Sequence, residues 1–106
     1  MKIEVAPQLN PEEILRRAGY FKLVSNKHDQ ISWIRRLGSG FYPRFHVYLD
    51  ERIINLHLDQ KQASYQGVTA HSGEYTGPVV EAEALRIVEV ANQIMKEKFV
   101  DINKDF

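Results

Sequence analysis

Residues 44–59 read RFHVYLDERIINLHLD, an alternation of apolar and polar side chains that decides the fold. A period of two is typical of β-strands that bury one face and expose the other. Two strand-like runs, 44–49 and 52–58, are separated by Asp50-Glu51, which suits a tight hairpin. This turn predicts Phe45 opposite Leu56. The apolar members of both runs then share the core face, namely Phe45, Val47, Leu49, Ile54, Leu56 and Leu58.

The opposite face of this hairpin carries the polar side chains. Its members are Arg44, His46, Tyr48, Ile53, Asn55, His57 and Asp59. His57 and Asp59 lie two residues apart on one strand and therefore point to the same side. The predicted register places His46 diagonal to His57, within reach of two imidazole rings.

The flanking sequence predicts two helices and further strands. Asn10-Pro11-Glu12-Glu13 has the N-cap, first-turn proline and acidic residues of a helix start, and Gly19 is a natural stop. Residues 20–24 and 31–37 read as strands, and Lys2–Val5 as a short edge strand. A long helix begins at Pro78 and ends near Phe99, after a loop over residues 62–77.

The predicted fold class is therefore α+β. An antiparallel sheet of three to five strands packs on two helices, in the order α-β-β-β-β-α with an additional N-terminal edge strand. We expect residues 1–106 to form a single domain with a frayed tail from about residue 100.

Composition narrows the classes of function. The chain has 106 residues, of which 43% are hydrophobic and 26% charged, as in ordinary globular proteins. The absence of cysteine excludes disulfides, thiolate zinc sites and cysteine nucleophiles. We find neither a membrane-length apolar run nor a signal-peptide core, and so expect a cytoplasmic protein without a membrane partner. A formal net charge of zero weighs against nonspecific binding of nucleic acid.

Histidines and acids gather between residues 44 and 74. Imidazole nitrogens and carboxylate oxygens are ligands for divalent metals such as Zn²⁺. The candidate metal ligands are His46, His57, Asp59, His71 and Glu74, the last two supplied by the predicted loop.

The same residues also suit a metal-free site. His57 and Asp59, with Lys61 continuing the alternation of their strand, are candidate catalytic groups for acid–base chemistry. Arg44 and Tyr48 are candidate contacts for a small or phosphate-bearing ligand. A bland alternative is a solvated sheet face that carries histidines by chance. Whether the chain is an enzyme stays open.

Two non-enzymatic readings complete the alternatives. Arginines and aromatic residues interleave over residues 33–48, as in surfaces on which single-stranded nucleic acid stacks; they are Trp33, Arg35, Arg36, Phe41, Tyr42, Arg44 and Tyr48. An open sheet face carrying Ile53 suits a protein-interaction module or a homodimer.

The order of helix, three strands and helix is similar to that of double-stranded RNA-binding domains and HicA-type RNase toxins. Residues 14–24, ILRRAGYFKLV, resemble the opening helix and strand of these toxins. The Gly-Ser-His of the toxins' second strand is absent, and the nearest histidine lies in Lys27-His28-Asp29. We therefore transfer no activity from the resemblance.

Overall fold

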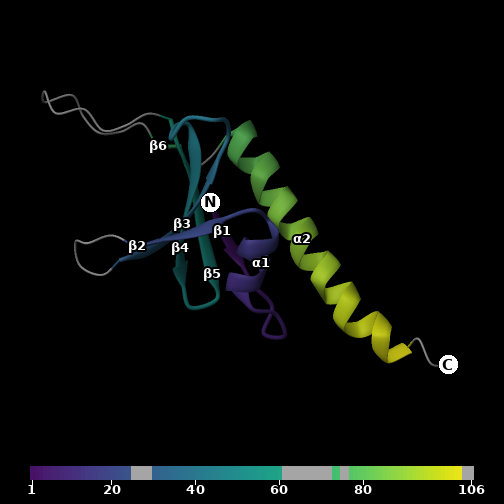
Figure 1. The fold of residues 1–106 in the computed structure, drawn as a ribbon. Helices are drawn as coiled ribbons and strands as arrows, with labels where there is room; N and C mark the ends of the chain where they lie inside the picture. The colour runs from purple at the N-terminus through teal and green to yellow at the C-terminus, as the bar shows by residue number, and fades with distance from the viewer. Residues whose placement is uncertain (25–29, 61–72, 75–76, 104–106) are drawn as a thin grey trace, which may run out of the picture.

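A computed structural model describes residues 1–24, 30–60, 73–74 and 77–103 of the chain. Figure 1 shows the order of its elements. They are β1 (Lys2–Glu4), α1 (Pro11–Arg17), β2 (Phe21–Val24), β3 (Ile31–Arg36), β4 (Arg44–Asp50), β5 (Ile53–Asp59), β6 (Gly73–Glu74) and α2 (Pro78–Asn103).

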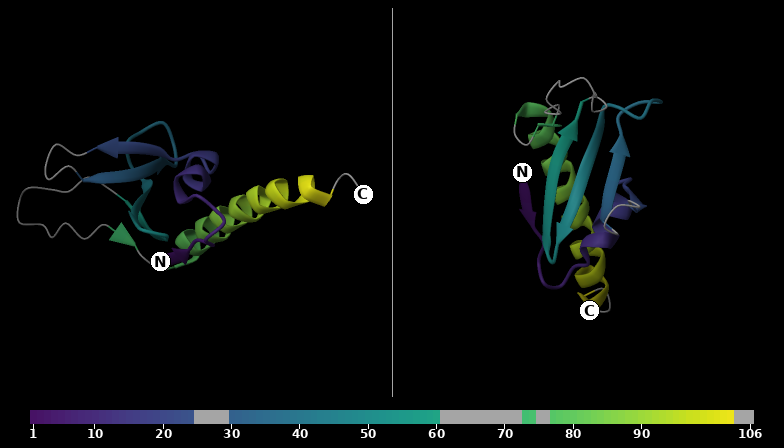
Figure 2. Two further views of the ribbon diagram at one scale, coloured as in Figure 1. Left: turned by 90° about the horizontal axis from the view of Figure 1, so that it is seen from below. Right: turned by 90° about the vertical axis from the view of Figure 1, so that its left-hand side faces the viewer.

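The strands form one antiparallel sheet in the order β1-β5-β4-β3-β2. The two-residue strand β6, inside the stretch expected to be a loop, pairs with the end of β5 beyond β1. Helix α2 runs along one face of the sheet, and the right-hand view of Figure 2 looks onto the other face. The predicted α+β class, with two helices on an antiparallel sheet and an N-terminal edge strand, is confirmed.

The start of α1 follows from its sequence. The Asn10 side chain accepts a hydrogen bond from the backbone N–H of Glu12 at 2.9 Å, and Pro11 occupies the first turn. The helix ends at Arg17 with Ala18 as its C-cap, and Gly19 follows with a φ of +96°, a conformation that favours glycine. This turn carries the chain directly into β2.

The hydrophobic core lies between α2 and the sheet. The predicted core face of the hairpin is confirmed, because Phe45, Val47, Ile54, Leu56 and Leu58 are buried and Leu49 packs against them. From α2 the buried hydrophobic residues are Val80, Ala84, Ile87 and Ile94. The helix ends four residues beyond the predicted Phe99, at Asn103.

The hairpin register differs from the predicted one by two residues. Asp50 pairs with Ile53, so the turn is Glu51-Arg52 and not Asp50-Glu51. Arg52 is held outside the ladder because its carbonyl accepts from the Val5 N–H and its guanidinium donates to carbonyls of the segment after β1. A shift of two preserves which residues share a face, but it places His46 directly opposite His57.

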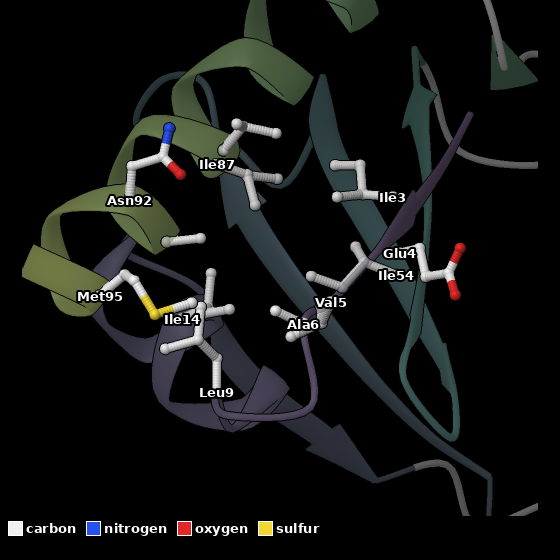
Figure 3. Close-up of a pocket in the computed structure, with 12 residues that line it drawn as sticks. Ile3, Glu4, Val5, Ala6, Leu9, Ile14, Ile54, Ile87, Asn92 and Met95 are labelled. Atoms are coloured by element: carbon white, nitrogen blue, oxygen red, sulfur yellow. The ribbon is translucent and has the colours of Figure 1, made fainter. Parts of the chain in front are cut away.

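A cavity of about 140 Å³ lies on the core side of the sheet (Figure 3). Its walls come from the β1 region, α1, β5 and α2, and include Ile3, Leu9, Ile14, Ile54 and Met95. The lining is mainly apolar and carries no imidazole. The histidine face points away from this cavity, on the other side of the sheet.

Candidate functional site

The β4–β5 ladder builds the histidine cluster. His46 on β4 lies opposite His57 on β5, and Arg44 lies opposite Asp59. The centroids of the two imidazole rings are 4.8 Å apart. Alternation puts all four side chains on the face opposite α2, so the predicted grouping of His46, His57 and Asp59 is present in the structure.

Asp59 is the centre of this cluster. Its Oδ2 lies 2.9 Å from His46 Nδ1 and 3.4 Å from Arg44 Nε, and its Oδ1 lies 3.2 Å from His57 Nε2. Burial by itself would raise the pKa of the Asp59 carboxyl, but the hydrogen bonds from His46 and His57 outweigh burial and hold this pKa well below its usual range. The carboxylate is therefore ionised and accepts N–H bonds from both rings.

The second nitrogen of His46 is the anomaly of the site. When Nδ1–H donates to the Asp59 carboxylate and the ring is neutral, Nε2 carries the lone pair. Within the described part of the chain, Nε2 is the one buried side-chain nitrogen or oxygen without a hydrogen-bond partner. Leaving such an acceptor unpaired costs about 1–3 kcal/mol. A buried ring nitrogen without a hydrogen-bond partner calls for an explanation beyond packing.

Both histidines are buried, at 9% exposure for His46 and 7% for His57. The ring of Tyr48 lies 4.6 Å from the His46 ring and stacks on the His57 ring at 5.7 Å. The alternative of a solvated face with chance histidines therefore does not describe this pair. Tyr48, predicted as a ligand contact, packs against both imidazoles.

The donor set matches the chemistry of a transition-metal site. Ligand atoms of His46, His57 and Asp59 all lie within 4.8 Å of one another. In a tetrahedral zinc site with bonds near 2.1 Å, neighbouring donors are about 3.4 Å apart. The widest separation must therefore shorten by roughly 1.4 Å, whereas the two nitrogen–oxygen contacts to Asp59 are already short enough. Two imidazoles and one carboxylate would leave a fourth position for water or substrate.

The remaining predicted site residues are Lys61, His71, Glu74 and Arg44. Lys61 and His71 lie outside the described residues. Glu74 belongs to β6, where its backbone pairs with Leu58 and Gly73 pairs with Asp59. Arg44 contacts the Asp59 carboxylate, so the predicted phosphate-binding residue already has an anionic partner inside the chain.

A second polar cluster, which sequence reasoning missed, surrounds the buried Glu83 on α2. Tyr20 donates its hydroxyl proton to Glu83 at 2.6 Å, and Arg86 donates two hydrogen bonds at 2.7 and 2.9 Å. Arg86 also donates to the Ala18 carbonyl, and Arg35 lies 3.6 Å from Glu83.

Burial, followed by the bond to Glu83, raises the pKa of Tyr20 far above its usual range. The position of Glu83, three residues after Val80 on the buried stripe, was the signal that could have found this cluster. Its donors satisfy the carboxylate and fasten α2 to the junction of α1 and β2, which is a structural role.

Comparisons of the chain with protein-family models, curated proteins and solved structures gave no match. Within the described residues, neither helix combines the length and apolarity that crossing a membrane requires.

Proposed function

We propose that the chain binds one divalent transition-metal ion, such as Zn²⁺, through His46, His57 and Asp59. The observation that carries this proposal is the convergence of two imidazoles and a carboxylate, with ligand atoms within 4.8 Å, on a partly buried sheet face. Binding at the ring nitrogens that face Asp59 would require each neutral imidazole to carry its proton on its other nitrogen, so that both facing nitrogens would offer lone pairs to the ion. Rigid strands supply all three ligands, which limits the reorganisation that binding requires.

The types of ligand atom in this cluster favour a transition metal over Mg²⁺ or Ca²⁺. Those harder ions prefer several oxygen ligands, whereas this cluster offers two nitrogens and one carboxylate. A Zn²⁺ ion held by three protein ligands polarises a bound water or a phosphoryl oxygen at its open position. A small or phosphate-bearing ligand is the substrate class that this chemistry serves.

The test is isothermal titration of the untagged, EDTA-treated protein with Zn²⁺, Mn²⁺ and Mg²⁺. We expect one equivalent of Zn²⁺ to bind and to raise the melting temperature, because an ion that binds only the folded state stabilises it by mass action. His57→Ala removes this binding, whereas His28→Ala, which changes a histidine outside the described residues, serves as the matched control. Zinc binding that survives in His57→Ala overturns the proposal.

General acid–base chemistry without a metal is the second candidate, and the unpaired Nε2 of His46 favours it. Asp59 fixes the tautomer of His46 as an orienting carboxylate does in an Asp–His pair. Because Nε2 is buried, a substrate reaches it only after the covering side chains move. Phosphodiester hydrolysis that persists in EDTA and is lost in His46→Gln would support this candidate, and hydrolysis unaffected by His46→Gln would remove it.

A further inference from the structure

Two arginines lie opposite each other at the end of the sheet where β3 ends and β4 begins. Arg36 and Arg44 are direct partners in the β3–β4 ladder, on the face opposite α2. Like charges at opposed positions destabilise a sheet unless something neutralises them. Arg44 has Asp59 at 3.4 Å, whereas Arg36 is exposed and makes no ion pair within the described residues. Among the residues that the structure describes, the Arg36 charge at this end of the sheet therefore has no counterion.

Aromatic rings surround the same two guanidinium groups. The Arg36 guanidinium carbon lies 4.2 Å from the Phe41 ring centre and 5.8 Å from that of Phe21. The Arg44 guanidinium carbon lies 4.5 Å from the Tyr42 ring centre. Phe41 is 55% exposed and Phe21 46% exposed, so water contacts rings that ordinarily belong in a core. Exposed apolar rings beside an unneutralised cation are typical of a binding surface.

We propose that this surface, formed by Phe21, Arg36, Phe41, Tyr42 and Arg44, binds single-stranded nucleic acid. The guanidinium groups contact backbone phosphates, and unpaired bases stack on the exposed rings. A duplex satisfies only the charges, because its base faces are already stacked inside the helix. The proposal goes beyond the metal site and does not depend on it, since neither arginine is a metal ligand.

The neighbouring Arg35 does not belong to this surface. Alternation turns its side chain to the α2 face, where it lies 3.6 Å from Glu83. Among the described residues of this surface, the available cations are therefore Arg36 alone or Arg36 together with Arg44, depending on whether Arg44 leaves Asp59. For single strands, each neutralised phosphate contributes about −0.7 to the slope of log K against log salt concentration. We expect a shallow slope, between about −0.7 and −1.4.

The experiment measures fluorescence anisotropy of a labelled oligothymidylate of about 12 nucleotides, in EDTA-containing buffer at several salt concentrations. Arg36→Ala weakens binding and removes about 0.7 from the slope. Phe41→Ala weakens binding about 5- to 140-fold and leaves the slope unchanged, because base stacking is not electrostatic.

Two matched controls separate the surface from general effects. Lys2→Ala removes a cation from the same sheet face. Lys2 on β1 pairs with Asn55 of β5, which lies four residues, or about 13 Å along the strand, from Arg44's partner Asp59. Phe99→Ala removes a phenylalanine of similar exposure, 44%, from the far end of α2. Both controls should bind like the unaltered protein, and circular dichroism confirms that every variant is folded.

Three results overturn the inference. The first is no binding by the folded protein at low salt, and the second is unchanged affinity in both Arg36→Ala and Phe41→Ala. The third is equally tight binding of a duplex or of heparin with no effect of Phe41→Ala, which reduces the surface to a general polyanion contact. In EDTA, where no metal is bound, His57→Ala keeps Arg36 and Phe41 and should still bind the oligonucleotide, so failure of the metal proposal is distinguished from failure of this one.

Discussion

Replacement of Asp59 by asparagine tests the centre of the histidine cluster. The substitution keeps the size of the side chain but removes the charge that accepts hydrogen bonds from His46 and His57 and pairs with Arg44. A hydrogen bond to a charged group contributes about 1.5–3 kcal/mol, and a neutral one about 0.5–1.5 kcal/mol. Asparagine can retain both bonds only as neutral ones, after one ring changes its tautomer. The expected loss is therefore about 2 kcal/mol of unfolding free energy.

This loss is measurable by urea denaturation monitored by circular dichroism, with a melting temperature lower by roughly 10 °C. Asp50→Asn is the matched control, because Asp50 is an exposed aspartate on the same strand pair, where Ile53 is its partner. The control should lie within about 0.5 kcal/mol of the unaltered protein. If Asp59→Asn also lies within this range, the carboxylate does not organise the cluster and the reasoning fails.

Acid denaturation provides an independent check on Asp59. Because its folded pKa is lowered from the ordinary 3.8, its ionisation stabilises the fold above that value, and this stabilisation is lost as the pH falls further. The unfolding free energies of the unaltered protein and Asp59→Asn should therefore converge below about pH 4. A constant difference down to pH 2 would assign the loss to shape and not to charge.

Two further changes probe the frame around the site. Tyr20→Phe removes the hydroxyl whose pKa is raised in the folded state, so it should destabilise the protein at neutral pH by about 1–3 kcal/mol. The variant should also lose less stability above about pH 10, because it has no hydroxyl to ionise. Urea titrations at several alkaline pH values measure this difference, and equal alkaline sensitivity in both proteins would contradict it. Glu51→Gly relieves the strain of the φ of +54° at the hairpin turn and should stabilise the protein by about 0.5–1 kcal/mol. This value is the strain relieved minus the entropy cost of glycine. A destabilised variant would show that the turn is unstrained.

The sequence predicted the two faces of the hairpin but not its register. Alternation over residues 44–59 correctly assigned Phe45, Val47 and Leu56 to the core. The turn was misplaced because Glu51 adopts a left-handed conformation without being glycine or asparagine, so the usual turn signal is absent. The error was an even number of residues, and the grouping of His46 with His57 therefore survived it.

The depth of the site could not be read from the sequence. Burial of His46 and His57 depends on Tyr48 lying against both rings, and alternation alone places all three on a nominally polar face. Glu83 was overlooked because its buried partner Tyr20 lies 63 residues away in the sequence, so only the tertiary fold shows that this acidic residue is buried and paired. Periodicity assigns a residue to a face, whereas tertiary packing decides whether that face is wet.

Asp59 links the two proposals thermodynamically. Without a metal, the Asp59 carboxylate contacts the side chains of His46, His57 and Arg44 at the same time. A bound Zn²⁺ takes up that carboxylate charge and weakens its hold on Arg44, which becomes available to a phosphate. Zinc should therefore tighten oligonucleotide binding and move the salt slope from about −0.7 towards −1.4.

By reciprocity, the oligonucleotide should tighten zinc binding by the same factor. Zinc titrations with and without oligothymidylate measure this coupling, and Arg44→Lys should weaken it because lysine lacks the planar group that contacts both Asp59 and the Tyr42 ring. Binding of both ligands without coupling would mean that Arg44 stays on Asp59, which would leave Arg36 as the cation that contacts phosphate.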